Sequence, residues 1–149
     1  MSEYLTQLAA AGVEVKDSNP RALAPAWRLP LAPEHWGQAA QVAQAMGLRH
    51  AGLWADVRDG EDESEAIEVY ACLEQAGQYL VLVTQVPLAE PRLSSHSHCY
   101  PGVNRLERHA HDLTGLDWLD QPDNRRAPLR LFTRLETATL GGYSTNRWT

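Results

Sequence analysis

Three stretches in the middle of the chain have the hydrophobic pattern of β-strands. In residues 51–58 and again in residues 67–74, every second position is apolar, which is typical of strands with one buried face. Residues 79–86 are apolar on both faces, and we expect them to form the most buried strand. Gly77 lies in the short connection before this strand, where it provides a positive φ for a tight turn. A shorter strand is predicted at residues 27–29, ended by Pro30.

Two longer stretches carry apolar residues at helical spacing. The first runs from Pro33 to Met46, with the proline in the first turn and Gly47 placed to end the helix. The second opens at Pro101 and ends at Gly115. Its predicted apolar stripe consists of Val103, Leu106, Ala110 and Leu113. Together the elements predict an α+β fold: a mainly antiparallel sheet of about four strands, with helices packed on one face.

The pattern divides the chain into three parts. Residues 1–25 are expected to form an N-terminal helix and a linker, because the polar stretch 17–25 contains two prolines and has the composition of a loop. Residues 26–126 form the α+β domain. Residues 127–149 have little periodicity, and we expect an extended C-terminal tail that depends on contacts with something else. The acidic turn at residues 59–65 is either a solvated hairpin loop or a docking patch for a basic partner.

Composition narrows the possible partners. The chain has 149 residues and a net charge of −6, which argues against a nucleic-acid binder because phosphate backbones attract clusters of Lys and Arg. No apolar stretch approaches the ~20 residues needed to cross a bilayer, and the N-terminus does not have the pattern of a signal peptide. The two cysteines, Cys72 and Cys99, do not suggest a disulfide framework. We therefore expect a single soluble domain in a reducing compartment.

The sequence offers no cofactor site and no catalytic residue. It contains neither a GxSxG motif nor a phosphate-binding glycine-rich loop, and two cysteines are too few to hold an iron–sulfur cluster. A zinc site is the alternative, because His96, His98 and Cys99 share a loop and His111 is on the following helix. His109 and His111 lie about 200° apart around a helix and cannot chelate one ion together. Without a metal, His96 and His98 are expected to be exposed loop residues.

The second helix and its flanks carry a resemblance to a known family. Residues 100–116 read Tyr-Pro-Gly-Val-Asn-Arg-Leu-Glu-Arg-His-Ala-His-Asp-Leu-Thr-Gly-Leu, which resembles the signature helix of the 30-kDa subunit family of NADH dehydrogenase, the respiratory complex I. Residues 121–126, Gln-Pro-Asp-Asn-Arg-Arg, are similar to the family's His-Pro-Asp-Leu-Arg-Arg, and residues 80–88 are similar to its last strand before the signature loop. The resemblance covers roughly residues 27–126.

The resemblance implies a non-catalytic accessory subunit of a membrane-associated redox complex, either complex I or an energy-converting [NiFe] hydrogenase. Such a subunit would dock on the large subunit that carries the [NiFe] site or borders the quinone pocket, on the cytoplasmic side of the membrane. It would position this partner without inserting into the membrane. The chain has Arg105, His109, His111 and Thr114 where the family usually has other residues, which favours a divergent paralogue.

The same segment supplies the candidate interface residues. Arg108 and Asp112 are four residues apart and share a helix face, as do Glu107 and His111. Arg125 and Arg126 either pair with carboxylates of this helix or reach carboxylates of a partner. The full set of candidate partner-interface residues is Glu107, Arg108, Asp112, Pro122, Asp123, Arg125 and Arg126. Ion pairs within the domain are the alternative to an interface for these charges.

Overall fold

The computed structural model describes residues 2–15, 21–23, 25–58 and 65–122. Its helices are α1 (Ser2–Ala10), α2 (Trp36–Ala45) and α3 (Asn104–Thr114), and single 3-10 turns, Pro33–His35 and Pro101–Val103, precede α2 and α3. The main sheet contains β1 (Arg21–Leu23), β2 (Ala26–Pro30), β3 (Arg49–Arg58), β4 (Ala66–Gln75) and β5 (Gln78–Pro87). A second, two-stranded sheet contains β6 (Arg92–Ser94) and β7 (Asp117–Leu119).

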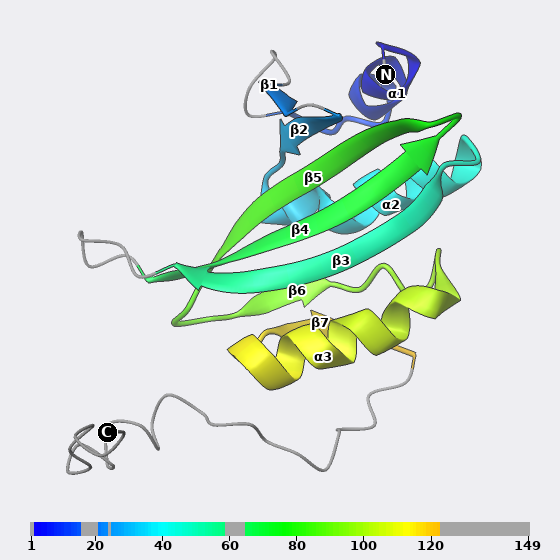
Figure 1. The fold of residues 1–149 in the computed structure, drawn as a ribbon. Coiled ribbons are helices and arrows are strands. Elements are labelled where there is room, and N and C mark those ends of the chain that lie inside the picture. Colours follow the sequence, from blue (N-terminus) through cyan, green and yellow to red (C-terminus); the bar gives the residue numbers. More distant parts are fainter. Residues whose placement is uncertain (1, 16–20, 24, 59–64, 123–149) are drawn as a thin grey trace, which may run out of the picture.

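The main sheet confirms the predicted α+β class and adds a detail that the pattern does not show. The strand order is β1-β2-β5-β4-β3 (Figure 1), with β3, β4 and β5 in an antiparallel meander. Strand β2 pairs with β5 in parallel, which makes the sheet mixed. The short β1 lies in the stretch predicted to be a linker, and it pairs with β2 as a hairpin.

The predicted central strand and its turn are confirmed. Strand β5 lies between β2 and β4, and all its residues from Leu80 to Thr84 are buried. The turn that leads into it has Ala76 at φ 50° and Gly77 at φ 77°, the two positive φ angles of a two-residue hairpin turn whose twist matches that of the strands. The backbone N–H of Gly77 donates to the Glu74 carboxylate over 2.9 Å.

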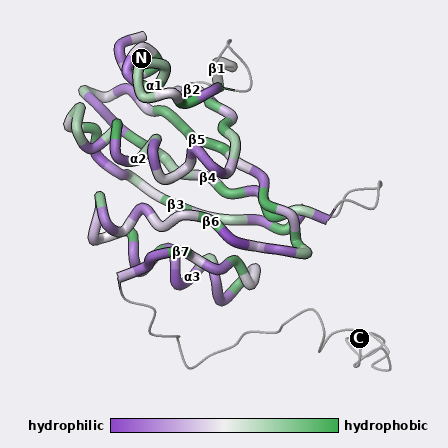
Figure 2. The backbone as a smooth tube through the Cα atoms, turned by 180° about the vertical axis from the view of Figure 1, so that it is seen from behind, coloured by the Kyte–Doolittle hydropathy of each residue, from purple (hydrophilic) through white to green (hydrophobic). Residues whose placement is uncertain are grey.

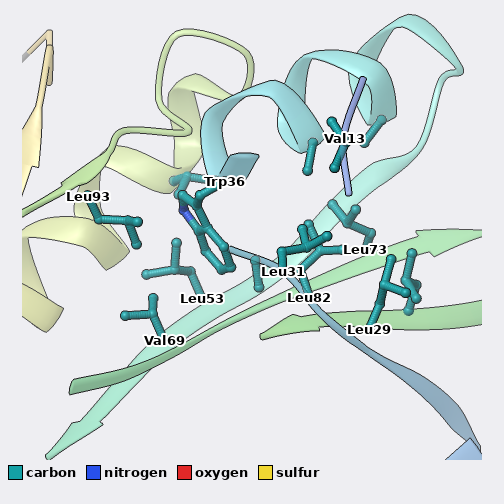
Figure 3. Close-up of a cluster of buried hydrophobic side chains, with 14 of the residues drawn as sticks. Val13, Leu29, Leu31, Trp36, Leu53, Val69, Leu73, Leu82 and Leu93 are labelled. Atoms are coloured by element: carbon teal, nitrogen blue, oxygen red, sulfur yellow. The ribbon is translucent and has the colours of Figure 1, made fainter. Parts of the chain in front are cut away.

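Helices α1 and α2 cover one face of the main sheet, and the hydrophobic core lies between them and the strands (Figures 1 and 2). The indole of Trp36, at the start of α2, is fully buried. Figure 3 shows it above Leu53 and Val69, with Leu31 beside it. Burying a side chain of this size stabilises the fold by roughly 2–3 kcal/mol. The buried indole thus holds α2 against the sheet, and α2 in turn contacts α1 and β6.

The opposite face of β3, β4 and β5 carries no helix among the described residues (Figure 1). The carboxylate of Glu68 is nevertheless almost fully buried there, because two arginines enclose it: Arg28 Nη2 lies 3.1 Å from Oε1 and Arg58 Nε lies 2.6 Å from Oε2. Next to this triad the rings of Trp54 and Tyr70 stack with centroids 5.1 Å apart. The predicted alternation places these side chains on the correct face, but nothing in the sequence indicates the triad.

Candidate partner-binding site

The signature helix is α3, and its ends are formed by the residues that the sequence pattern indicates. Pro101 lies in the 3-10 turn before the helix. At the other end Gly115 adopts the left-handed conformation, with φ 78°, and its N–H donates to the carbonyl of His111 over 2.8 Å. Helix α3 lies beyond β3, the edge strand of the main sheet (Figures 1 and 2). Strand β7 then runs back along the helix toward its first turn.

Glu107 is the centre of this arrangement, and its side chain is completely buried. Its Oε1 accepts the backbone N–H of His96 over 2.6 Å. Its Oε2 accepts three more hydrogen bonds, from Ser95 Oγ over 2.7 Å, Ser97 Oγ over 2.5 Å and Gln121 Nε2 over 3.3 Å. A buried carboxylate is stable only when donors replace the water that it loses. Glu107 therefore joins α3, the loop after β6 and the end of the described chain.

The other expected partners of the signature helix lie elsewhere. His111 does not pair with Glu107: its Nδ1 is 2.9 Å from the carbonyl oxygen of Leu116 and 3.5 Å from Asp117 Oδ1. Arg108 and Asp112 are half-buried on the helix, and Pro122 is exposed. Asp123, Arg125 and Arg126 lie outside the described residues.

The predicted apolar stripe of α3 is half wrong. Val103 and Ala110 are buried as expected, but Leu106 is 37% exposed and Leu113 is 52% exposed. The buried row is Val103, Glu107 and Ala110, at positions i, i+4 and i+7. The sequence prediction treats Glu107 as a polar surface position. It therefore assigns Leu106 and Leu113 to the buried face of the helix in place of Glu107. No feature of the helix alone reveals the rotation, since the donors that bury the carboxylate come from other segments.

His96 is also misplaced by the sequence prediction, because it is fully buried and not exposed. Its ring stacks on Trp36 with centroids 4.7 Å apart. Its Nε2 lies 3.0 Å from the carbonyl oxygen of Trp36, and its Nδ1 lies 3.4 Å from Nε2 of His50. Because a carbonyl can only accept, Nε2 of His96 carries the proton and its Nδ1 accepts from His50. Burial lowers the pKa of His96 to about 3 and that of His50 to about 4, so both rings are neutral at pH 7.

The other residues of the possible zinc site do not gather around His96. His98 is exposed and its Nε2 contacts the carbonyl oxygen of Asp120. Cys99 is half-buried, and burial raises the pKa of its thiol. In the part of the chain that the structure describes, no three His, Cys, Asp or Glu side chains are placed to hold a metal ion. The loop thus serves to hold α2 and α3 together through His96 and its neighbouring serines.

Comparison with known proteins gives the family. The model of the family "Respiratory-chain NADH dehydrogenase, 30 Kd subunit" matches residues 29–132, more than half of the chain. The chain belongs to this 30-kDa subunit family. The match confirms the resemblance, and it continues past β7 into the residues that contain Arg125 and Arg126. No significant match was found among curated proteins.

Solved structures show the same fold. A trypsin-resistant fragment of Nqo5 is 20% identical, with a TM-score of 0.64, and the match covers 82% of this chain and 97% of the fragment. A chain of the membrane-bound sulfane sulfur reductase, an archaeal respiratory membrane complex, is 17% identical, with a TM-score of 0.63. That match covers 99% of this chain and 94% of the other. In the described parts of this 30-kDa-family chain, no helix has the length and apolar character needed to span a membrane.

Proposed function

We propose that the chain is a non-catalytic accessory subunit of a membrane-associated redox complex of the complex I or energy-converting [NiFe] hydrogenase type, and that it docks on the large subunit of that complex. It acts there by assembly and positioning, at the periphery of the inner face of the cell membrane, on the cytoplasmic side. The observation that carries this proposal is the family match over residues 29–132, which includes the start of the tail.

The charge distribution supports a docking role for residues 123–149, which contain the tail and the two arginines just before it. Residues 123–149 contain five of the 13 Lys and Arg residues of the chain but only two of the 19 Asp and Glu residues. A basic segment attached to an acidic domain fits a partner surface rich in carboxylates, which Arg binds with two parallel hydrogen bonds. In this proposal Asp123 and the two neighbouring arginines contact the large subunit directly. Glu107 contributes from inside the domain, by holding the segment from which the tail starts.

Reversing the charges of Arg125 and Arg126 to Glu tests the proposal. The full chain is co-expressed with the [NiFe] or quinone-site large subunit encoded in the same genome, and co-purification and thermal unfolding are measured. An interface role predicts lost association and a melting temperature within the small range expected for surface changes. Arg134→Glu with Arg147→Glu is the matched control, since it makes the same charge change in the tail outside the family match. The proposal is rejected if the unaltered chain binds neither kind of large subunit.

A further inference from the structure

Helix α3 has an exposed side opposite its buried row. This side consists of Arg105, Leu106, His109 and Leu113, with the half-buried Asp112 at its margin. Leu106 and Leu113 are 37% and 52% exposed. Because each residue advances about 100° around a helix, a spacing of seven residues places the two leucines within about 20° of each other. Arg105 and Asp112 are also seven residues apart, and they form a charged line about 100° from the line of the leucines.

The charged line runs against the dipole of its own helix. Arg105 lies in the first turn of α3 and Asp112 in the last turn. The free N–H groups make the start of a helix partly positive and the free carbonyl groups make its end partly negative, so each side chain lies at the end that disfavours its charge. In the part of the chain that the structure describes, neither side chain forms an ion pair. Both charges therefore lack a counterpart within the described domain.

A second copy of the same helix, turned antiparallel, supplies this counterpart. In a two-fold pair centred on the middle of α3, Leu106 of each copy faces Leu113 of the other. The same rotation brings Arg105 of each copy beside Asp112 of the other, about 3 Å apart along the helix axis at 1.5 Å per residue. Each charge then also lies at the end of the other helix that favours it. A parallel pair would place the two charged lines on opposite sides and leave them unpaired.

We infer that the exposed side of α3 is a self-association surface, on which two copies of the chain pair through antiparallel α3 helices. The leucines form an apolar centre and the Arg105–Asp112 pairs a polar rim, which is the usual composition of an interface. A helix of 11 residues is about 16 Å long, so the contact is smaller than the ~1,200 Å² at the lower end of stable interfaces. The dimer is therefore weak, with a dissociation constant on the order of 10–100 µM. This inference concerns the isolated chain and does not rest on the proposed function.

Sedimentation velocity of the isolated full chain, at concentrations below and above this range, measures the association. The average mass should rise with concentration from that of one chain toward that of two. Leu106→Ser with Leu113→Ser should weaken the association by about tenfold or more, while the melting temperature stays within a few degrees because both side chains are exposed. Trp54→Ser is the matched control. Its indole is 45% exposed on the face of the sheet that carries no helix among the described residues, and its loss should leave the association unchanged.

Two charge reversals test the antiparallel arrangement itself. Arg105→Asp and Asp112→Arg each place like charges opposite one another in a dimer, so each variant alone should associate about tenfold more weakly or less. In an equimolar mixture the two variants should pair with each other, because both contacts again join opposite charges. Each reversal also places at its end of α3 the charge that the helix dipole favours. The melting temperatures of both variants should therefore not fall, which separates lost association from lost folding.

The possible outcomes are distinct. A monomer at every concentration, a dimer that persists in the leucine variant, or reversal variants that do not pair when mixed would each overturn the inference. If the unaltered chain alone stays monomeric but the leucine variant binds the co-expressed large subunit more weakly, the exposed side of α3 is a surface for that subunit. The inference is then wrong, while the proposed function stands.

Discussion

Gln121 donates a hydrogen bond to the buried carboxylate of Glu107 over 3.3 Å, one residue before the described chain ends. The signature glutamate of α3 thus acts inside the domain, where it also receives three donors of the loop after β6. This relationship changes the interpretation of the signature. The carboxylate of Glu107 accepts its hydrogen bonds within the domain, and it determines where the loop after β6 and Gln121 lie relative to α3.

Glu107→Gln should destabilise the isolated chain by about 2 kcal/mol, and Glu107→Ala by about 3 kcal/mol. The amide directs two donors of its own into a site filled with donors, and alanine leaves the donors of two segments, the loop after β6 and Gln121, without an acceptor. Urea unfolding monitored by tryptophan fluorescence measures both values. Glu34→Gln is the control, since Glu34 also lies in a first helical turn but is exposed. It should cost less than about 0.5 kcal/mol. Equal effects at the two positions would refute the role given to Glu107.

Gly37 is required by the close approach of α2 to β6. A Cβ atom added to Gly37 would lie 2.9 Å from the Cβ of Ser94, closer than two carbon atoms can pack. Alanine in a helix is usually favoured over glycine by up to about 1 kcal/mol, but overpacking costs about 1–3 kcal/mol. Gly37→Ala should therefore lower the free energy of unfolding, by about 1 kcal/mol in urea titrations.

Two further variants check this explanation. Adding Ser94→Gly to Gly37→Ala removes the obstructing atom and should recover part of the lost stability. Gly102→Ala places a Cβ where no atom lies within 4 Å, and its effect should be neutral or stabilising. A stabilised Gly37→Ala variant would mean that α2 and β6 are less tightly packed than described.

The sequence predicts the parts of the fold that depend on local periodicity. Alternation in residues 67–74 predicts the buried face of β4, and the continuous apolar run predicts the central β5. In residues 51–58 the predicted buried face is correct from Leu53 to Val57, but a register shift between His50 and Gly52 leaves Ala51 exposed and His50 half-buried.

Features that depend on distant segments are not visible in these patterns. His96 is buried because it stacks on Trp36, which lies 60 residues earlier. Arg28 and Glu68 are 40 residues apart in the sequence. They meet because β2 and β4 both pair with β5, which brings their two strands into the same sheet.

The buried pair His96 and His50 predicts how stability depends on pH. An unfolded histidine has a pKa of about 6.5, whereas burial lowers the pKa of His96 to about 3 and that of His50 to about 4. Between these values the unfolded chain binds protons that the folded chain does not bind. The free energy of unfolding should therefore fall as the pH falls below about 6.5. Each histidine lowers it by up to about 1.4 kcal/mol per pH unit. The stability that comes from keeping His96 neutral is fully lost near pH 3.

Urea unfolding at a series of pH values between 7 and 4 measures this slope. His96→Gln removes one of the two groups and should flatten the slope markedly, even though it also lowers stability at pH 7 by removing the stacking on Trp36. The slope separates titration from packing, because lost packing shifts the whole curve without tilting it. If the His96→Gln variant keeps the slope of the unaltered chain, the pKa of His96 does not differ between the folded and unfolded states, and the prediction is wrong.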